Sequence, residues 1–264
     1  MNIRMVESGK VTQSEKILFL KSKGTETRII ETLISDGYEV WYTDGIIEDT
    51  ESFDLAISFG YRHILKGDVL HNDKCPIINL HIGFLPYNRG ADPNFWSFYE
   101  GTPSGVTIHL IDEGIDTGDI IFQRYVNFDR QEKTFAQSYN RLIEEVEDLF
   151  IENREIILSK SFTSFPQRGP GSYHKVADLP EEFGGWDSLI TDEIVRLDKL
   201  LKNKVSKKST IIDEIENARK SNNVNWMDLL RLAFLRSPSE AREIVRRINK
   251  DDNRISDLFK QLGE

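Results

Sequence analysis

The sequence lacks any long apolar run and contains a single cysteine, Cys75, in 264 residues. A helix that spans a membrane needs about 20 consecutive apolar residues, and one cysteine cannot form an internal disulfide. The first residues also lack the continuous apolar stretch of a signal peptide. We therefore expect a cytoplasmic protein with no membrane partner.

Metal-ligand spacings and an excess of positive charge are missing as well. The five histidines are scattered along the chain, so no metal site is predicted. The net charge of -10 argues against a nucleic-acid partner, because proteins that hold nucleic acid through its phosphates need a basic face. Residues 204–264 hold 13 Lys and Arg against 10 Asp and Glu, so the negative excess lies entirely in residues 1–203.

Short apolar runs and helical spacings of apolar residues indicate the fold. Helices are predicted at 29–34, at 93–99 with proline in the first turn, and at 134–158, which is long and amphipathic. Strands are predicted at 16–20, 38–42, 55–59, 76–80, 105–111 and 120–128. This order is typical of an α/β protein with an open, mainly parallel twisted sheet.

The composition changes twice along the chain and predicts three parts. Residues 1–158 are assigned to a catalytic domain that ends with the long helix. Residues 159–203 are rich in glycine and proline and predict a loop-rich extension that packs on that domain. Residues 204–264 predict a small all-helical C-terminal module, because helix-capping residues occur at Asn225 and at Ser237-Pro238.

An unusual polar pair stands at the end of one predicted strand. Asn79 and His81 are separated by one residue, so both side chains project from the same face, about 7 Å apart at a rise of about 3.3 Å per residue. Ligands of open α/β sheets bind beyond the carboxyl ends of the strands. The pair is therefore either a site that addresses one reacting group or a core histidine satisfied by its neighbours, and the pair alone does not decide between them.

A longer motif follows the pair and carries a family resemblance. Leu85-Pro86 and Arg89-Gly90 come next, and Ile115-Asp116-Thr117-Gly118-Asp119 comes later. The combination resembles the folate-dependent formyltransferase family, closely over about residues 50–130 and loosely over about the first 200. The resemblance implies a Rossmann-like formyltransferase fold, 10-formyltetrahydrofolate as the donor, no metal, and Asn79, His81 and Asp116 as the catalytic residues.

Two positions depart from the motif of that family. Gly83 stands where many relatives have serine, and Phe84 replaces the first leucine. Neither change removes one of the three catalytic groups. Both lie in the loop beside the expected formyl site, whose shape the motif therefore leaves open.

The three residue types suit the transfer of a formyl group from a folate nitrogen to an amine. The Asn79 amide can donate an N–H to the oxygen on which negative charge develops. His81, with an ordinary pKa of about 6.5, can shuttle a proton from the attacking amine to the departing nitrogen. Asp116 can orient the imidazole and stabilise its charged form.

The acceptor amine is suggested by a second set of residues. The stretch 89–98, with 105–109 and 171–174, is similar to the nucleotide-sugar N-formyltransferases that act on 4-amino-4,6-dideoxy sugars, including those of pseudaminic-acid-type pathways. That branch implies a product for surface or flagellar glycans. Two alternatives stay open: a methionyl-tRNA formyltransferase-like enzyme, and a protein that binds or hydrolyses the folate and recruits a partner through its helical tail.

Ligand contacts are expected from the same resemblance. For the folate they are Phe59, Gly60, Tyr61, Phe84, Leu85, Pro86 and Ile111. For the nucleotide-linked amino sugar they are Arg89 and Lys175 at the diphosphate, Trp96 at the base, and Asn94, Tyr173 and His174 at the sugar. Packing roles remain alternatives for Leu85, Tyr61 and Trp96, and a solvated loop position for His174.

The other histidines and the oligomeric state receive simpler interpretations. His63, His71 and His109 are interpreted as surface or strand-packing residues, although His109 lies on a strand that leads toward Asp116. If the chain self-associates, a homodimer is expected, because it is the commonest homo-oligomer.

Overall fold

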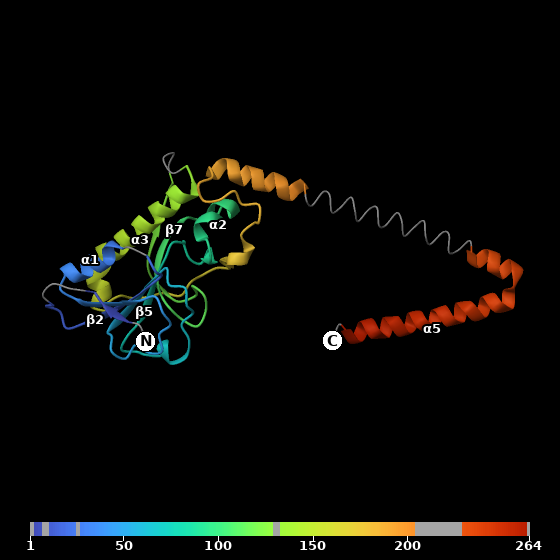
Figure 1. Ribbon diagram of the computed structural model, residues 1–264, viewed down its shortest axis with the longest axis horizontal. Coiled ribbons are helices and arrows are strands. Elements are labelled where there is room, and N and C mark those ends of the chain that lie inside the picture. The colour runs from blue at the N-terminus through green and yellow to red at the C-terminus, as the bar shows by residue number, and fades with distance from the viewer. Residues whose placement is uncertain (1–2, 7–10, 25–26, 129–132, 204–228, 263–264) are drawn as a thin grey trace. The chain divides into compact units, whose positions relative to one another are not determined.

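The computed structural model describes residues 3–6, 11–24, 27–128, 133–203 and 229–262 (Figure 1). The chain divides into two compact units, Met1–Leu197 and Asp198–Glu264. The expected helix cap at Asn225 and the start of the expected helical module at residue 204 lie outside the described residues.

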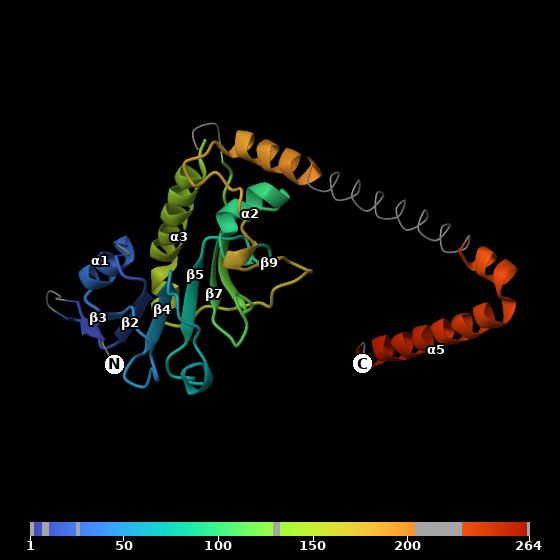
Figure 2. The ribbon, with the colours of Figure 1, turned by 45° about the vertical axis from the view of Figure 1, so that its right-hand side comes forward.

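A seven-stranded sheet forms the centre of the first unit in the described part of the chain. Its strands lie in the order β1-β3-β2-β4-β5-β7-β8 (Figure 2). Five of these strands run in one direction, while β1 and β7 run in the other. The fold class predicted from the sequence is therefore confirmed. The bounds are β1 Arg4–Met5, β2 Lys16–Lys21, β3 Glu39–Thr43, β4 Leu55–Phe59, β5 Ile77–His81, β7 Gly105–Leu110 and β8 Ile120–Tyr125.

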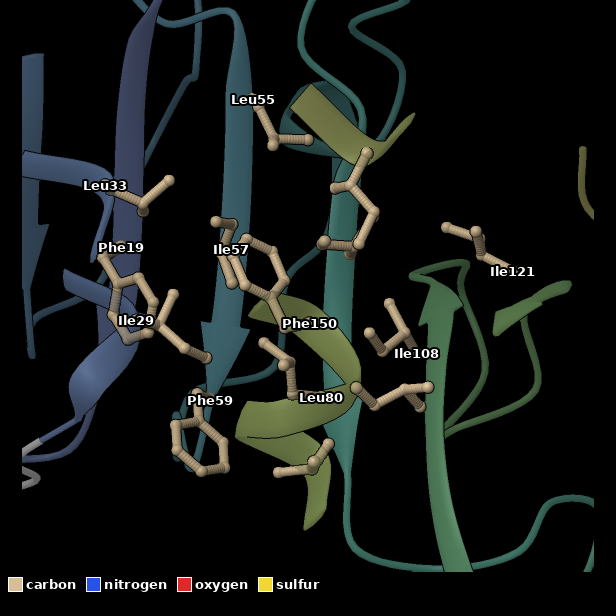
Figure 3. Packing of buried hydrophobic residues seen from close by; sticks show 14 of the residues in the cluster. Phe19, Ile29, Leu33, Leu55, Ile57, Phe59, Leu80, Ile108, Ile121 and Phe150 are labelled. Carbon is tan, nitrogen blue, oxygen red and sulfur yellow. The ribbon is translucent and has the colours of Figure 1, made fainter. Parts of the chain in front are cut away.

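Helices α1 (Arg28–Ser35) and α3 (Phe135–Leu158) cover one face of the sheet (Figures 1 and 2). The start of α3 is set by a capping box, in which Thr134 accepts from the backbone of Gln137 and the Gln137 side chain accepts from the backbone of Thr134. Phe150 of α3 lies among strand residues that include Ile57 and Leu80 (Figure 3). Burying a side chain of this size contributes roughly 1.5–3 kcal/mol, so this face is the main core.

The opposite face of the sheet is covered by connecting segments. Leu18, Leu20, Ala56 and Ile77 pack there against residues of the loops after β3, β4 and the short 3-10 helix Gly67–Val69. Side chains alternate between the two faces of a strand. Because Ile78 and Leu80 point to the helical face, Asn79 and His81 project to the loop-covered one.

The segment after α3 returns to the sheet. A pair of backbone hydrogen bonds joins Phe165 to Ile120, and the strand β9 (Tyr173–His174) pairs in parallel with β6 (Arg89–Gly90). Helix α2 (Pro93–Glu100) contributes Phe95 and Trp96 to a separate aromatic cluster. Phe135, Ile190 and Leu197 complete the buried part of that cluster, which ties residues 190–197 to the first unit.

The described residues of the second unit are helical except Ser237, and its first six, 198–203, end a helix that begins at residue 190 in the segment expected to be loop-rich. Residues 229–236 form one helix, and α5 (Pro238–Leu262) follows. The predicted start at Ser237 and Pro238 is observed, with Ser237 Oγ 2.8 Å from the Glu240 carboxylate. Among the described residues, no helix has the length and apolar content required to cross a bilayer.

Candidate active site

Four polar side chains meet at the carboxyl end of β5. Asn79 of β5 lies directly opposite His109 of β7 in the antiparallel register. The Asn79 amide nitrogen is 3.2 Å from His109 Nε2 and 3.2 Å from Asp116 Oδ1. The structure thus brings together the three predicted catalytic residues and adds His109 to them.

His81 is held by contacts on both of its ring nitrogens. Its Nε2 lies 3.1 Å from the Asn88 carbonyl oxygen, and its Nδ1 lies 3.5 Å from Asp116 Oδ2. Asn88 is completely buried and has a left-handed backbone, with φ of 57°. Burial lowers the pKa of His81, although the Asp116 carboxylate acts in the opposite direction. A ring that is neutral near pH 7 can accept a proton, and the adjacent carboxylate can stabilise the imidazolium that results.

His109 fixes the orientation of the Asn79 amide. Its Nδ1 lies 2.7 Å from the Leu110 carbonyl oxygen, and its Nε2 lies 3.2 Å from the Asn79 amide nitrogen and 3.5 Å from Asp116 Oδ1. The imidazole is 1% exposed. It does pack on the strand, as the sequence predicted, but its contact with the site was missed. The cross-strand pairing with Asn79 is the signal that would have revealed it, and this pairing depends on tertiary register.

Asp116 stands on the loop between β7 and β8. Its backbone is left-handed, with φ of 53°, and its Oδ2 accepts from the Gly90 backbone N–H at 2.8 Å. Burial would raise the pKa of this carboxyl group. The neighbouring His81, His109 and the Gly90 N–H outweigh burial and hold the pKa well below its ordinary value. Asp116 therefore stays ionised beside the two rings.

The cluster opens into a cleft of about 790 Å³, a volume within the range of small-molecule sites. The predicted folate residues Phe59, Gly60, Tyr61 and Ile111 line it. Sequence reasoning did not predict several other lining residues, which include Arg62, Ile64, Ile82, Ala91, Ile115 and Tyr139. In the described part of the chain, no group of three or more His, Cys, Asp or Glu side chains is arranged to hold a metal ion.

Three predicted folate residues lie outside the lining of the cleft. Leu85 is 1% exposed, its N–H donates to Thr107 Oγ1, and its carbonyl accepts from Gln123. Phe84 packs edge-on against Tyr125. The peptide bond between Leu85 and Pro86 is cis. None of the three is among the residues that line the cleft, and their contact with the folate stays a prediction.

The predicted acceptor contacts Asn94 and Trp96 belong to the interior of α2. Asn94 is 1% exposed, and its amide donates to the Phe135 carbonyl and accepts from Ser138 Oγ. Trp96 is 7% exposed and stacks on His174 at 3.8 Å between ring centroids. The Asn94 amide is thus occupied inside the core, whereas Trp96 Nε1 is buried without a hydrogen-bond partner. Both side chains pack in the interior, and their contact with an acceptor stays a prediction.

The other predicted acceptor residues lie on the strip formed by β6 and β9. Tyr173 and Lys175 are exposed, whereas His174 is mostly covered and lies 3.2 Å from the Glu100 carboxylate. The Arg89 guanidinium is bound to the side-chain oxygen of Gln167. None of these side chains is among the residues that line the cleft, but the adjacent Gly90, Ala91 and Val176 are.

Gly83 has a steric role beside His81. A Cβ atom at this position would lie 2.6 Å from His81 Nε2 and 2.9 Å from its Cδ2. The φ of Gly83 is not in the left-handed region, so the backbone itself would accept another residue. The missing side chain therefore makes room for the imidazole.

The chain is similar to several known proteins. A family model described as formyl transferase matches residues 47–153. The dTDP-4-amino-4,6-dideoxyglucose formyltransferase of Mycobacterium bovis is 34% identical over 136 residues, which are 52% of this chain and 57% of that protein. The methionyl-tRNA formyltransferase of Pelotomaculum thermopropionicum is 32% identical over 133 residues, which are 50% of this chain and 42% of that protein. The chain thus spans about half the length of the curated relatives it matches.

A solved structure covers more of the chain. It is the crystal structure of the formyltransferase PseJ from Anoxybacillus kamchatkensis, in complex with UDP-4,6-dideoxy-4-formamido-L-AltNAc and tetrahydrofolate. The identity is 38%, the TM-score is 0.60, and the match covers 67% of this chain and 96% of that one.

Proposed function

The chain belongs to the formyl transferase family, and on that premise we propose that it moves a formyl group from 10-formyltetrahydrofolate to the amino group of a nucleotide-linked amino-deoxy sugar. The observation that carries the proposal is the contact network of Asn79, His81 and Asp116 at the wall of a cleft. In the reaction, a bond forms between the amine and the formyl carbon. The bond from that carbon to the folate nitrogen breaks, and one proton passes from the amine to that nitrogen.

His81 is the group proposed to carry the proton. Its pKa is lowered by burial, so the ring is neutral at pH 7 and can accept the proton of the attacking amine. Asp116, which stays ionised at 3.5 Å from Nδ1, stabilises the imidazolium until the proton moves to the leaving nitrogen. The low exposure of both groups strengthens this interaction, because little water screens it.

Asn79 is proposed to donate to the developing oxyanion. Its amide nitrogen donates to Asp116 Oδ1 and contacts His109 Nε2, and both distances are 3.2 Å. This is the upper end of ordinary hydrogen-bond distances, and catalytic hydrogen bonds are often long before the substrate binds. One N–H can therefore turn to the formyl oxygen while the other keeps the amide oriented.

The donor side of the cleft is proposed to be the wall formed by Phe59, Gly60, Tyr61 and Ile111. These residues combine apolar side chains with exposed backbone at the ends of β4 and β7, which suits a flat ring with hydrogen-bonding edges. The folate supplies the activated formyl group. The family relationship and the tetrahydrofolate in the PseJ complex support this choice of donor.

The acceptor is proposed to be a nucleotide-linked 4-amino-4,6-dideoxy sugar. The support is the likeness to PseJ over nearly all of that chain and to the dideoxyglucose enzyme. The net charge of -10 disfavours transfer RNA as the acceptor. A role in surface or flagellar glycan synthesis and a cytoplasmic location complete the proposal.

A direct assay tests the proposed function. The protein is incubated with 10-formyltetrahydrofolate and, separately, with dTDP-4-amino-4,6-dideoxyglucose, the UDP-linked 4-amino precursor of the sugar bound to PseJ, and methionyl-tRNA. Formylation of a nucleotide sugar is expected. Formylation of methionyl-tRNA alone would refute the acceptor, and release of formate without transfer would indicate a folate hydrolase.

A matched pair of histidine variants tests the catalytic assignment. His81→Ala should abolish turnover, because no other group takes the proton, while folate binding measured by calorimetry stays close to wild type. His71→Ala is the control, since His71 is exposed and does not line the cleft. Substantial turnover by His81→Ala would contradict the role of His81.

A further inference from the structure

Gln167 connects the extension after α3 to the candidate active site. Its amide nitrogen donates to two backbone carbonyl groups, those of Asp116 at 2.8 Å and Gly118 at 2.9 Å. Its amide oxygen accepts from Arg89 Nε at 3.0 Å and Arg89 Nη2 at 2.7 Å. An arginine only donates hydrogen bonds, so Arg89 fixes the orientation in which the Gln167 amide nitrogen faces the two carbonyls.

The segment that carries Gln167 is anchored on both sides. Two backbone hydrogen bonds join Phe165 to Ile120, at 2.9 and 3.0 Å. After Gln167, the backbone of Ser172 pairs with Pro86 and Arg89. These anchors hold Gln167 beside the loop between β7 and β8. Among the described residues, Gln167 and not a strand of the central sheet donates to the Asp116 carbonyl.

The backbone of Asp116 needs such support. Its φ of 53° lies in the left-handed region, which residues other than glycine seldom adopt and which persists only where the surroundings impose it. From this conformation the carboxylate meets Asn79, His81 and the Gly90 N–H. An extended or right-handed backbone would direct the carboxylate elsewhere.

We infer that Gln167 is a positioning residue for the formyl transfer proposed above: its amide nitrogen holds the Asp116 peptide in the left-handed turn from which the carboxylate reaches His81. The inference rests on the proposed function. It also gives Arg89 a different role from the predicted diphosphate contact, because Arg89 orients Gln167. Gln167 touches no reacting atom and acts through Asp116.

Two substitutions at Gln167 separate its two hydrogen-bonding ends. Gln167→Glu keeps an acceptor for Arg89 and removes the donor to the two carbonyls, whereas Gln167→Met keeps the length of the side chain and removes both. We expect each to lower kcat roughly ten- to hundredfold, the scale of a misplacement of about 1 Å, and to change KM for either substrate less than about twofold. Asn72→Asp is the control, because it removes an amide donor from a loop that does not line the cleft.

The pKa of His81 can be measured in the Gln167 variants, and a general loss of stability would not change it. The charged and titratable groups that face its ring are Asp116 and His109. If the carboxylate withdraws, the imidazolium loses its neighbour, so the acidic limb of the pH profile of kcat should move to lower pH. The same shift should appear in a nitrogen-15 NMR titration of the His81 ring, with His81→Ala identifying its signals.

The outcomes distinguish this inference from the proposed function. A lower kcat with an unmoved acidic limb and an unmoved His81 titration in both Gln167 variants would overturn the positioning role. If the wild-type protein formylates none of the acceptors, the proposed function fails. The NMR titration then still decides whether Gln167 positions Asp116, since it requires no turnover. If Gln167→Glu does not fold, Gln167→Met provides the same two measurements.

Discussion

Replacing Gly83 with alanine should move the imidazole of His81 while leaving the backbone undisturbed. The new Cβ would lie 2.6 Å from His81 Nε2 and 3.2 Å from the Cβ of Pro93. Ordinary contact begins at 3.4 Å, so the ring must shift by about 0.8 Å. The ring is 6% exposed and has neighbours on both nitrogens, which leaves it little room to move without losing one of them.

The magnitude follows from these contacts. Overpacking of a dense interior costs about 1–3 kcal/mol, and loss of the hydrogen bond to the Asn88 carbonyl adds about 1 kcal/mol. We therefore expect Gly83→Ala to lower the free energy of unfolding by about 2–4 kcal/mol. A displacement approaching 1 Å in a catalytic group can reduce the rate about 100-fold, so kcat should fall by roughly that factor.

The measurements are urea denaturation of the free protein and initial rates of formyl transfer. Gly83→Ser should behave like Gly83→Ala, because both place Cβ at the same point. Gly45→Ala is the matched control: its φ is also outside the left-handed region, and the nearest atom to the new Cβ is Thr43 Oγ1 at 3.6 Å. Wild-type kcat and stability in Gly83→Ala would refute the argument that the missing side chain seats the imidazole.

Three further predictions follow from burial and charge. Burial lowers the pKa of His81, so the acidic limb of the pH profile of kcat/KM should lie below about pH 6.5. In the residual activity of Asp116→Asn this limb should move to still lower pH. An acidic limb above about pH 6.5 in the wild type would contradict a neutral His81 ring. Asn94→Ala should lower the free energy of unfolding by about 1–3 kcal/mol in urea denaturation, because the Asn94 amide is bound inside the core. KM for the sugar should stay unchanged. A rise in KM without loss of stability would instead support the ligand contact predicted from the sequence. Burial raises the pKa of the Cys75 thiol to about 11, so this thiol should resist a disulfide reagent at pH 8 until urea unfolds the protein, and rapid labelling of the native protein would show that the thiol is accessible.

Much of the fold could be read from the sequence because it depends on local patterns. The apolar run at Leu55–Phe59 forms β4 with the predicted bounds, and the capping pair Thr134 and Gln137 starts α3 where the apolar spacing begins. The two-residue strands β6 and β9 were not predicted. They form only because residues 89–90 and 173–174 meet after the chain has folded, and no apolar pattern marks either of them.

For the active site, the sequence by itself determined which chemical groups are present and which face of β5 carries two of them. The spacing of Asn79 and His81 imposes a common face, and the longer motif identified Asp116 as their partner. Only the tertiary structure decided which further residues join the site and which leave it. His109 enters through the pairing of β5 with β7, and Asn94 of α2 forms its hydrogen bonds in the core with residues of α3. The physical reason is that a motif gives neighbours along the chain. Strand register and helix packing determine which side chains share a cavity and which form their hydrogen bonds within the core.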